Sequence, residues 1–405
     1  MTAVAARSWA PAGLSAGASV LVTVASLLIA RYDGFGVFGE FVAVQAIGVV
    51  LGIPMLWGVH VAASRAMAAR SDDRVVTGTA LASVTTAAAV TAFAYCAVLL
   101  AVSAPALLWH AAGLGASAAA LTLAESLLRI RDRQLLASGW RLAHGLSYLA
   151  AVLSVVGEGD PGTYSVMVTA ANTLCAAGML AGSRCVPGRP DPVLARTFLR
   201  EGWAYSTGQS LLALLFAFDV ILLVQAAGPA AVAVYALYVG SCRRVIGVLF
   251  TDSLASVLIA LLARRNPATG RRAVLRYAPR AIALSVTGAV VLVVAGLAAA
   301  GALHHLNAAL LALTAVGATA HALVVVLFCV VTVQPSLGLA RVRTALTAAF
   351  VPGLALQAAG GVFAGAPGMV AAFTFCNVAL GWWFLTVVRQ TPTVLPTPAT
   401  EMRSR

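Results

Sequence analysis

Two adjacent arginines, Arg243 and Arg244, stand inside an apolar stretch that runs from residue 229 to residue 262. Consecutive residues of an α-helix are about 100° apart around its axis, so both side chains can face one cavity. Counted from Pro229 at about 1.5 Å per residue, the pair lies about 21 Å along the helix, just past the midplane of a bilayer. A cation at that depth costs about 2.5–3.5 kcal/mol, so a carboxylate or an anionic ligand must compensate it. Because guanidinium groups match phosphate oxygens, the pair is a candidate substrate-binding site for a diphosphate.

Carboxylates in apolar stretches are the candidate internal partners of these cations. We expect Asp219 to lie well above the pair and Asp252 about 12 Å below Arg244, so that neither is in direct contact without a long reach of the arginine. Ligand binding and internal pairing therefore both stay open. A membrane carboxylate can also relay a coupling proton or sodium ion, but two nearby cations favour a counter-ion role. Glu40, near the outer end of the second apolar stretch, can line the rim of a cavity or sit at the membrane interface.

The composition excludes a soluble globular domain. The 405 residues are 61% hydrophobic and 10% charged, which is the balance of a polytopic membrane protein. We expect about twelve transmembrane helices and no soluble domain. The apolar stretches lie at residues 12–30, 36–63, 75–102, 105–128, 135–156, 163–182, 206–227, 229–262, 281–303, 309–333, 344–363 and 369–388.

Arginine accounts for the whole positive side of the net charge of +13, because the sequence contains no lysine. Under strict alternation of twelve helices, nearly all arginines outside the apolar stretches face one side, and only Arg31 faces the other. This positive-inside pattern predicts that both termini are cytoplasmic. It also predicts that 229–262 is one helix, because a break at Arg243 would move the arginine-rich segment 264–280 to the outside. Contact with membrane lipids explains the charge better than binding of nucleic acid, which we do not expect.

The sequence has no motif for catalysis, metal binding or nucleotide hydrolysis. No loop contains the H-E-x-x-H or G-x-S-x-G pattern, and the sequence lacks the phosphate-binding loop of ATPases. Its six cysteines are scattered without metal-ligand spacing. We therefore expect a protein that is not an enzyme and that needs no cofactor and no metal.

An internal repeat divides the chain. The segment that starts at Gly34 aligns with the segment that starts at Gly228, and in both halves a short turn precedes an unusually long apolar stretch. The predicted organisation is an N-terminal six-helix lobe (1–183), a cytoplasmic linker (184–201), a C-terminal six-helix lobe (202–388) and a disordered cytoplasmic tail (389–405). In transporters built from such repeats, the substrate site tends to lie between the halves.

The segment 31–70, RYDGFGVFGEFVAVQAIGVVLGIPMLWGVHVAASRAMAAR, resembles the first hairpin of bacterial polysaccharide flippases. These belong to the multidrug/oligosaccharidyl-lipid/polysaccharide exporter superfamily. FDVILL at 218–223 and VYAL at 234–237 are similar to that family's seventh and eighth helices. Glu40 departs from the resemblance, because the family has a small or apolar residue at this position.

The resemblance implies a V-shaped, all-α transporter of two six-helix lobes in the bacterial cytoplasmic (inner) membrane. It would alternate between inward-open and outward-open states. Its substrate would be a polyprenyl-diphosphate-linked oligosaccharide for cell-surface polysaccharide biosynthesis, moved to the outer leaflet with H⁺ or Na⁺ as a possible coupling ion.

Two other functions remain as alternatives. A multidrug/cation antiporter of the same superfamily usually needs acidic cavity residues, whereas the clearest deep charges in this chain are basic. A membrane enzyme acting on lipid-linked sugars needs a sizeable extracytoplasmic loop, and the predicted outer loops are very short.

Overall fold

The computed structural model describes residues 2–68, 73–101, 105–130, 133–183, 188–246, 286–333 and 339–390. Within these ranges the ordered elements are all helices. The first half of the chain contains α1 (Thr2–Tyr32), α2 (Gly34–Leu56), α3 (Val59–Ala68), α4 (Asp73–Ala101), α5 (Ala106–Ile130), α6 (Gln134–Leu153) and α7 (Pro161–Gly182). The second half contains α8 (Pro192–Tyr235), the π-helical turn η1 (Ala236–Gly240), α9 (Ser241–Ile246), an apolar helix at Val286–Ala299, the 3₁₀ turn η3 (Leu303–His305), α12 (Ala308–Val333) and α13 (Leu339–Gln390).

The two longest helices are each a hairpin of two helices. Gly228 in α8 has φ 80° and ψ 175°, and Gly365 in α13 has φ 58° and ψ −136°. These backbone angles suit glycine, which has no Cβ to clash. The chain reverses at both positions: Tyr235 contacts Asp219 across the first reversal, and Gly360 packs closely against Gly368 across the second.

The apolar stretches identified in the sequence are helical over most of their described length. The stretch 36–63 is broken between α2 and α3 at Trp57 and Gly58, which both have positive φ, and the stretches 135–156 and 281–303 end in turns. Eight helices among the described residues are long and apolar enough to cross a membrane, and two of these are the hairpins. Together with α6 and the shorter apolar helix 286–299, this agrees with the predicted all-α membrane protein. The arginine-rich segment 264–280 and residues 391–405 of the predicted tail lie outside the described residues.

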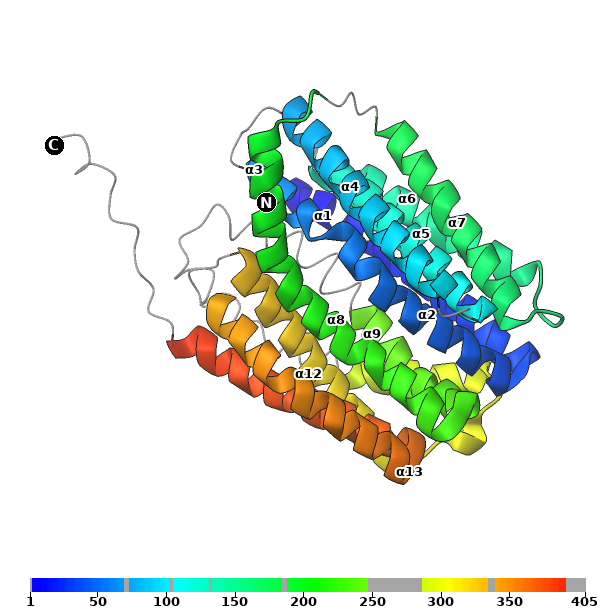
Figure 1. The fold of residues 1–405 in the computed structure, drawn as a ribbon. Helices are drawn as coiled ribbons and strands as arrows, with labels where there is room; N and C mark the ends of the chain where they lie inside the picture. Colours follow the sequence, from blue (N-terminus) through cyan, green and yellow to red (C-terminus); the bar gives the residue numbers. More distant parts are fainter. Residues whose placement is uncertain are drawn as a thin grey trace.

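The helices pack in two groups that α8 joins. In the first half, α1 packs on α6, and α5 packs on both α2 and α7. In the second half, α13 packs on α8 and on α12. The strongest packing between the halves is that of α2 on α8, and Figure 1 shows α8, in green, between the blue-to-teal helices and the orange-to-red ones.

The start of α8 lies inside the predicted linker 184–201. Asp191 caps this helix, because its side chain accepts hydrogen bonds from the amides of Val193 and Leu194. The first turns of α8 then pack on α3, where Trp57 and Trp203 stack with ring centroids 4.8 Å apart. The second part of the linker is therefore a helix held against the first half of the chain.

Candidate functional site

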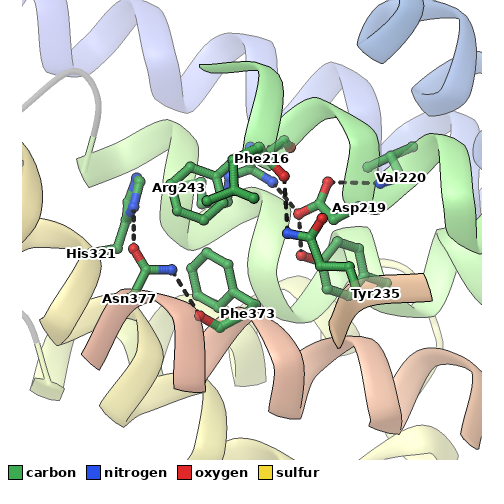
Figure 2. A network of polar contacts seen from close by, with 10 residues as sticks. Phe216, Asp219, Val220, Tyr235, Arg243, His321, Phe373 and Asn377 are labelled. Atoms are coloured by element: carbon green, nitrogen blue, oxygen red, sulfur yellow. Dashed lines mark hydrogen bonds and ion pairs between the residues drawn. The ribbon is translucent and has the colours of Figure 1, made fainter. Parts of the chain in front are cut away.

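A charged network lies inside the second half of the molecule, across the hairpin at Gly228 (Figure 2). Asp219 is fully buried on the first arm of α8, and Arg243 lies on α9, in continuation of the second arm. The Arg243 Nη1 donates to Asp219 Oδ2 at 2.8 Å, and Nη2 donates to the carbonyl oxygen of Phe216. The cation therefore compensates the charge of a carboxylate that is fully buried, where an unpaired charge would be costly.

Asp219 has two further donors. The amide of Val220 donates to Oδ1 at 2.7 Å, and the buried hydroxyl of Tyr235 donates to Oδ2. Hydrogen bonds to a carboxylate stabilise its charged form, and these two come from groups other than Arg243. The carboxylate thus keeps two hydrogen bonds even when the arginine side chain is elsewhere.

Aromatic rings surround the guanidinium of Arg243. Its Cζ lies 5.1 Å from the centroid of the Phe216 ring and 6.0 Å from that of Phe373. Cation–π contacts of this kind stabilise a cation that has lost most of its water. The side chain of Arg243 is nevertheless 22% exposed, whereas that of Asp219 is 0% exposed. Of the two charges, the cation is therefore the one that another ligand can approach.

A neutral layer of amide and imidazole groups extends the network toward α12 and α13. His321 Nδ1 lies 2.9 Å from Asn377 Oδ1, and Asn377 Nδ2 donates to the carbonyl of Phe373 at 2.8 Å. The His321 ring also contacts Phe216, with centroids 5.0 Å apart. These side chains hold the two rings that flank Arg243 (Figure 2).

The first half contains a related polar contact. Asn172 on α7 donates to Ser117 on α5 at 3.1 Å, and its oxygen lies 2.6 Å from His144 Nε2. Asn172 and Asn377 lie on the last helix of their respective halves, and both contact a neighbouring histidine. This correspondence fits the repeat seen in the sequence, but the first half lacks a described charge pair at the equivalent place.

By the sequence, contact between Asp219 and the arginines requires a long reach of the arginine, and the hairpin shows how Arg243 makes that reach. Asp219 precedes Gly228 by nine residues and Arg243 follows it by fifteen, so along the helix axes they are only about 9 Å apart. Side chains lean toward the N-terminal end of their own helix. In an antiparallel hairpin this makes the two side chains lean toward each other, and the long arginine closes the gap.

The structure also changes the description of the stretch 229–262. It is helical as far as Ile246, as predicted, but residues 236–240 form a π-helical turn within it. Nothing in the sequence indicated this turn or the role of Tyr235, because both depend on which side chains meet across the hairpin.

The other predicted site residues are placed as follows. Arg244 is on α9, but its side chain is outside the described part of the chain, as is the whole of Asp252.

Glu40 is half-buried on α2, and the described residues give it no hydrogen-bond or ion-pair partner. It follows Gly39, where α2 approaches the Gly228 hairpin so closely that an added Cβ would lie 1.8 Å from the carbonyl oxygen of Pro229. In the described ranges, no group of three His, Cys, Asp or Glu side chains could hold a metal ion.

Comparison with known proteins places the fold. No protein-family model and no curated protein sequence matches the chain. Among solved structures, the eukaryotic MATE transporter AtDTX14 is 14% identical with a TM-score of 0.62, covering 95% of this chain and 94% of that one. A MOP superfamily transporter from Pyrococcus furiosus, whose structure is described as having a binding pocket of reverse polarity, is 12% identical with a TM-score of 0.58, covering 94% and 96%.

The lipid II flippase MurJ in an inward closed conformation is 11% identical with a TM-score of 0.57, covering 93% of this chain and 86% of that one. At these identities the likeness concerns the fold and not the substrate. It extends over nearly the whole chain in each case, with both halves included. The chain therefore has the V-shaped, two-lobed, all-helical fold of the MOP superfamily transporters.

Proposed function

We propose that this chain is a flippase that moves a polyprenyl-diphosphate-linked oligosaccharide to the outer leaflet of a bacterial cytoplasmic membrane, for the synthesis of cell-surface polysaccharide. The observation that carries the proposal is the position of Arg243. It is a deep cation whose carboxylate partner is fully buried while the guanidinium itself is partly accessible. An accessible guanidinium at this depth suits the oxygens of a diphosphate.

In the proposed mechanism, Arg243 exchanges one anion for another. In the described state its partner is Asp219. When substrate is bound, the diphosphate takes this place, and Asp219 keeps the hydrogen bonds from Val220 and Tyr235. Separating the ion pair costs free energy. The new ligand offsets the part that concerns Arg243, and the remaining hydrogen bonds offset part of what concerns the carboxylate. Arg244 is proposed as a second ligand of the diphosphate.

Coupling to an ion gradient follows from the same exchange. A carboxylate that has lost its cation in a membrane interior gains from binding a proton or a sodium ion. Asp219 is therefore proposed as the counter-ion of Arg243 in one state and as the coupling carboxylate in the other. Asp252 is a further candidate for either role, and Glu40 is proposed to line the rim of the cavity.

The lobes that rock against each other are proposed to comprise residues 1–183 and 202–388. The segment 184–201 would link them, and residues 389–405 would form a disordered tail. Both termini would lie in the cytoplasm, as the arginine distribution predicts.

A flipping assay tests the proposal. The purified protein is placed in liposomes that contain a fluorescent polyprenyl-diphosphate-linked sugar, and the lipid that reaches the outer leaflet is measured by a quencher that does not cross the membrane. We expect Arg243→Gln to lower the initial rate by at least about tenfold, which corresponds to about 1.4 kcal/mol of lost interaction. The matched control Arg200→Gln removes an exposed arginine at the start of α8 and should leave the rate unchanged. Equal rates for both variants and the unmodified protein would rule out the proposed role of Arg243.

The multidrug/cation antiporter is the second candidate, and the likeness of the fold to MATE transporters favours it. Its cation would need a free carboxylate, but Asp219 is held by Arg243 in the described state. The same liposomes distinguish the two functions. An antiporter would exchange an organic cation for H⁺ or Na⁺ and would leave the lipid-linked sugar where it was.

A further inference from the structure

The π-helical turn η1 contains Tyr238 and separates Tyr235 from the arginine of the charged network. In this turn the amide of Ser241 donates to the carbonyl of Ala236, five residues earlier, in place of the four-residue spacing of an α-helix. Such turns insert one extra residue into a helix and are often found at functional sites. The turn at Ala236–Gly240 lies between Tyr235 and Arg243.

The extra residue is what brings Tyr235 and Arg243 to the same carboxylate. Over the eight residues between them, a regular α-helix turns through about 800°, so the side chains would be about 80° apart. The inserted residue takes up about 100° of that rotation and leaves the two side chains within about 20° of each other. Both contact Asp219 Oδ2, as this alignment requires.

Tyr238, inside the π-turn, joins this helix to the chain before α12. Its hydroxyl donates to the carbonyl of His305 at 2.8 Å and accepts from the amide of Asn307 at 2.9 Å. The ring of His305 in turn stacks on Phe35 at the start of α2, with centroids 5.4 Å apart and planes at 26°.

The stack between His305 and Phe35 is a contact between the two halves of the molecule. At the same end, Arg31 donates to the carbonyl of Ala299 at 3.2 Å. The α1–α2 turn and the segment 299–307 thus join the two halves at this end of the molecule in the described state, and this is the closing contact. Tyr238 is bound to the closing segment, and Tyr235, three residues earlier, is bound to the charged network.

We propose that the π-turn is a register switch between the Asp219–Arg243 pair and this closing contact. With the π-turn present, as in the described state, Arg243 pairs with Asp219. Tyr238 is then hydrogen-bonded to segment 302–307, whose His305 stacks on Phe35. When the extra residue leaves the turn, the following helix rotates by about 100° and advances by about 1.5 Å. Arg243 then turns away from Asp219, and Tyr238 no longer meets its two partners. The inference rests on the proposed function only for the identity of the anion that Arg243 meets next.

Hydrogen exchange measured by mass spectrometry on the full chain in lipid nanodiscs tests the switch without any substrate. Asp219→Asn removes the charge that holds Arg243 but keeps the shape of the side chain. We expect it to speed amide exchange in segment 302–307 by about fivefold or more, the low end of typical couplings between two sites. The control Gln357→Met removes a buried hydrogen bond to the carbonyl of Leu215, next to Phe216, and should leave this exchange unchanged.

The Asp219→Asn substitution is also made in a variant that lacks Gly240, and the comparison of the two results decides the test. Removing one residue converts the π-turn into an α-helical turn, so Tyr235 and Arg243 stay aligned but the register can no longer change. Asp219→Asn should therefore accelerate exchange in segment 302–307 in the full-length chain and have no effect there in the deletion. An equal acceleration in both backgrounds, or none in the full-length chain, overturns the proposal.

A second variant covers the case in which the deletion does not fold. Tyr238→Phe breaks both hydrogen bonds to the closing segment and keeps the ring. It should accelerate exchange in segment 302–307 by itself, and Asp219→Asn should add nothing to it. Additive effects of the two substitutions overturn the switch. Because no lipid-linked sugar is used, failure of the flipping assay with these results intact would contradict the proposed function alone.

Discussion

At the scale of single residues, the central feature is an ion pair in which Asp219 is fully buried and the side chain of Arg243 is partly exposed. Asp219 has hydrogen bonds from Val220 and Tyr235 in addition to the ion pair. Arg243 has the carboxylate, a carbonyl and two aromatic rings. The partners of the arginine are Asp219 and Phe216 on the first arm of α8 and Phe373 on α13, so the hairpin at Gly228 supplies most of the site.

Removing one partner of this pair should cost more stability than removing both. Arg243→Met leaves the carboxylate of Asp219 buried without its cation, and we expect a loss of about 3 kcal/mol, the low end of the usual range because the arginine is partly exposed. The double variant Arg243→Met with Asp219→Asn should recover most of that loss. Thermal unfolding in detergent measures both variants, and a double variant less stable than Arg243→Met would contradict this account.

At the scale of the helices, the hairpin at Gly228 brings the charges together. The backbone at Gly228 has φ 80° and ψ 175°, and a Cβ there would meet nothing within 4 Å. Any cost of a side chain at this position is therefore conformational and not steric. The separation of Asp219 and Arg243 is set by their distances from this turn on two different helices, and the long arginine side chain spans it.

The Gly228→Ala substitution should destabilise the protein by about 1–3 kcal/mol, because the backbone region of this residue is nearly confined to glycine. A suitable comparison is Gly36→Ala, at a position on α2 that also has nothing within 4 Å but has no positive φ. It should be neutral or slightly stabilising, because alanine favours helix. Equal unfolding temperatures for the two variants would show that the hairpin does not depend on the glycine.

The start of α7 provides a pH-dependent test of helix capping. Asp160 accepts hydrogen bonds from the amides of Gly162 and Thr163 and from the Thr163 hydroxyl, and these bonds lower the pKa of its carboxyl. A lowered pKa in the folded state contributes stability above the ordinary value of about 4, and this stability is lost as the pH falls through the folded value.

Asp160→Ala should therefore cost about 1 kcal/mol at neutral pH. Its unfolding temperature should approach that of the unmodified protein as the pH falls below about 4. Asp160→Asn, which caps without a titrating group, should show a smaller difference at neutral pH. A deficit of Asp160→Ala that stays constant from pH 7 to pH 3 would contradict the assignment of this cap.

At the scale of the whole molecule, much of the architecture could be predicted from the sequence. The apolar stretches are long and continuous, and in a membrane each must be a helix because its backbone groups have no other partners. A counter-ion role for Asp219 is one of the two interpretations that the sequence leaves open, and which arginine it pairs with depends on the hairpin. The π-turn at 236–240 could not be predicted, because no sequence signal marks it. Positions such as Arg244 and Asp252 remain predictions as site residues.

In the whole molecule, the two halves touch where Phe35 stacks on His305, and among the described residues the Asp219–Arg243 network lies in the second half. In the proposed flippase, the second half would carry the binding charge and the first half would provide the surface against which it moves. The proposed function depends on whether Arg243 exchanges its buried carboxylate for an anion on the substrate.

Binding of a polyprenyl-diphosphate lipid to the detergent-solubilised protein, measured by native mass spectrometry or microscale thermophoresis, tests this exchange most directly. Asp219→Asn releases Arg243 from its internal partner, so the lipid should bind about fivefold or more tightly, as expected when a competing state is removed. Arg243→Gln should weaken binding by a similar factor. If Asp219→Asn fails to tighten lipid binding and Arg243→Gln leaves it unchanged, Arg243 does not carry the diphosphate and the account is wrong.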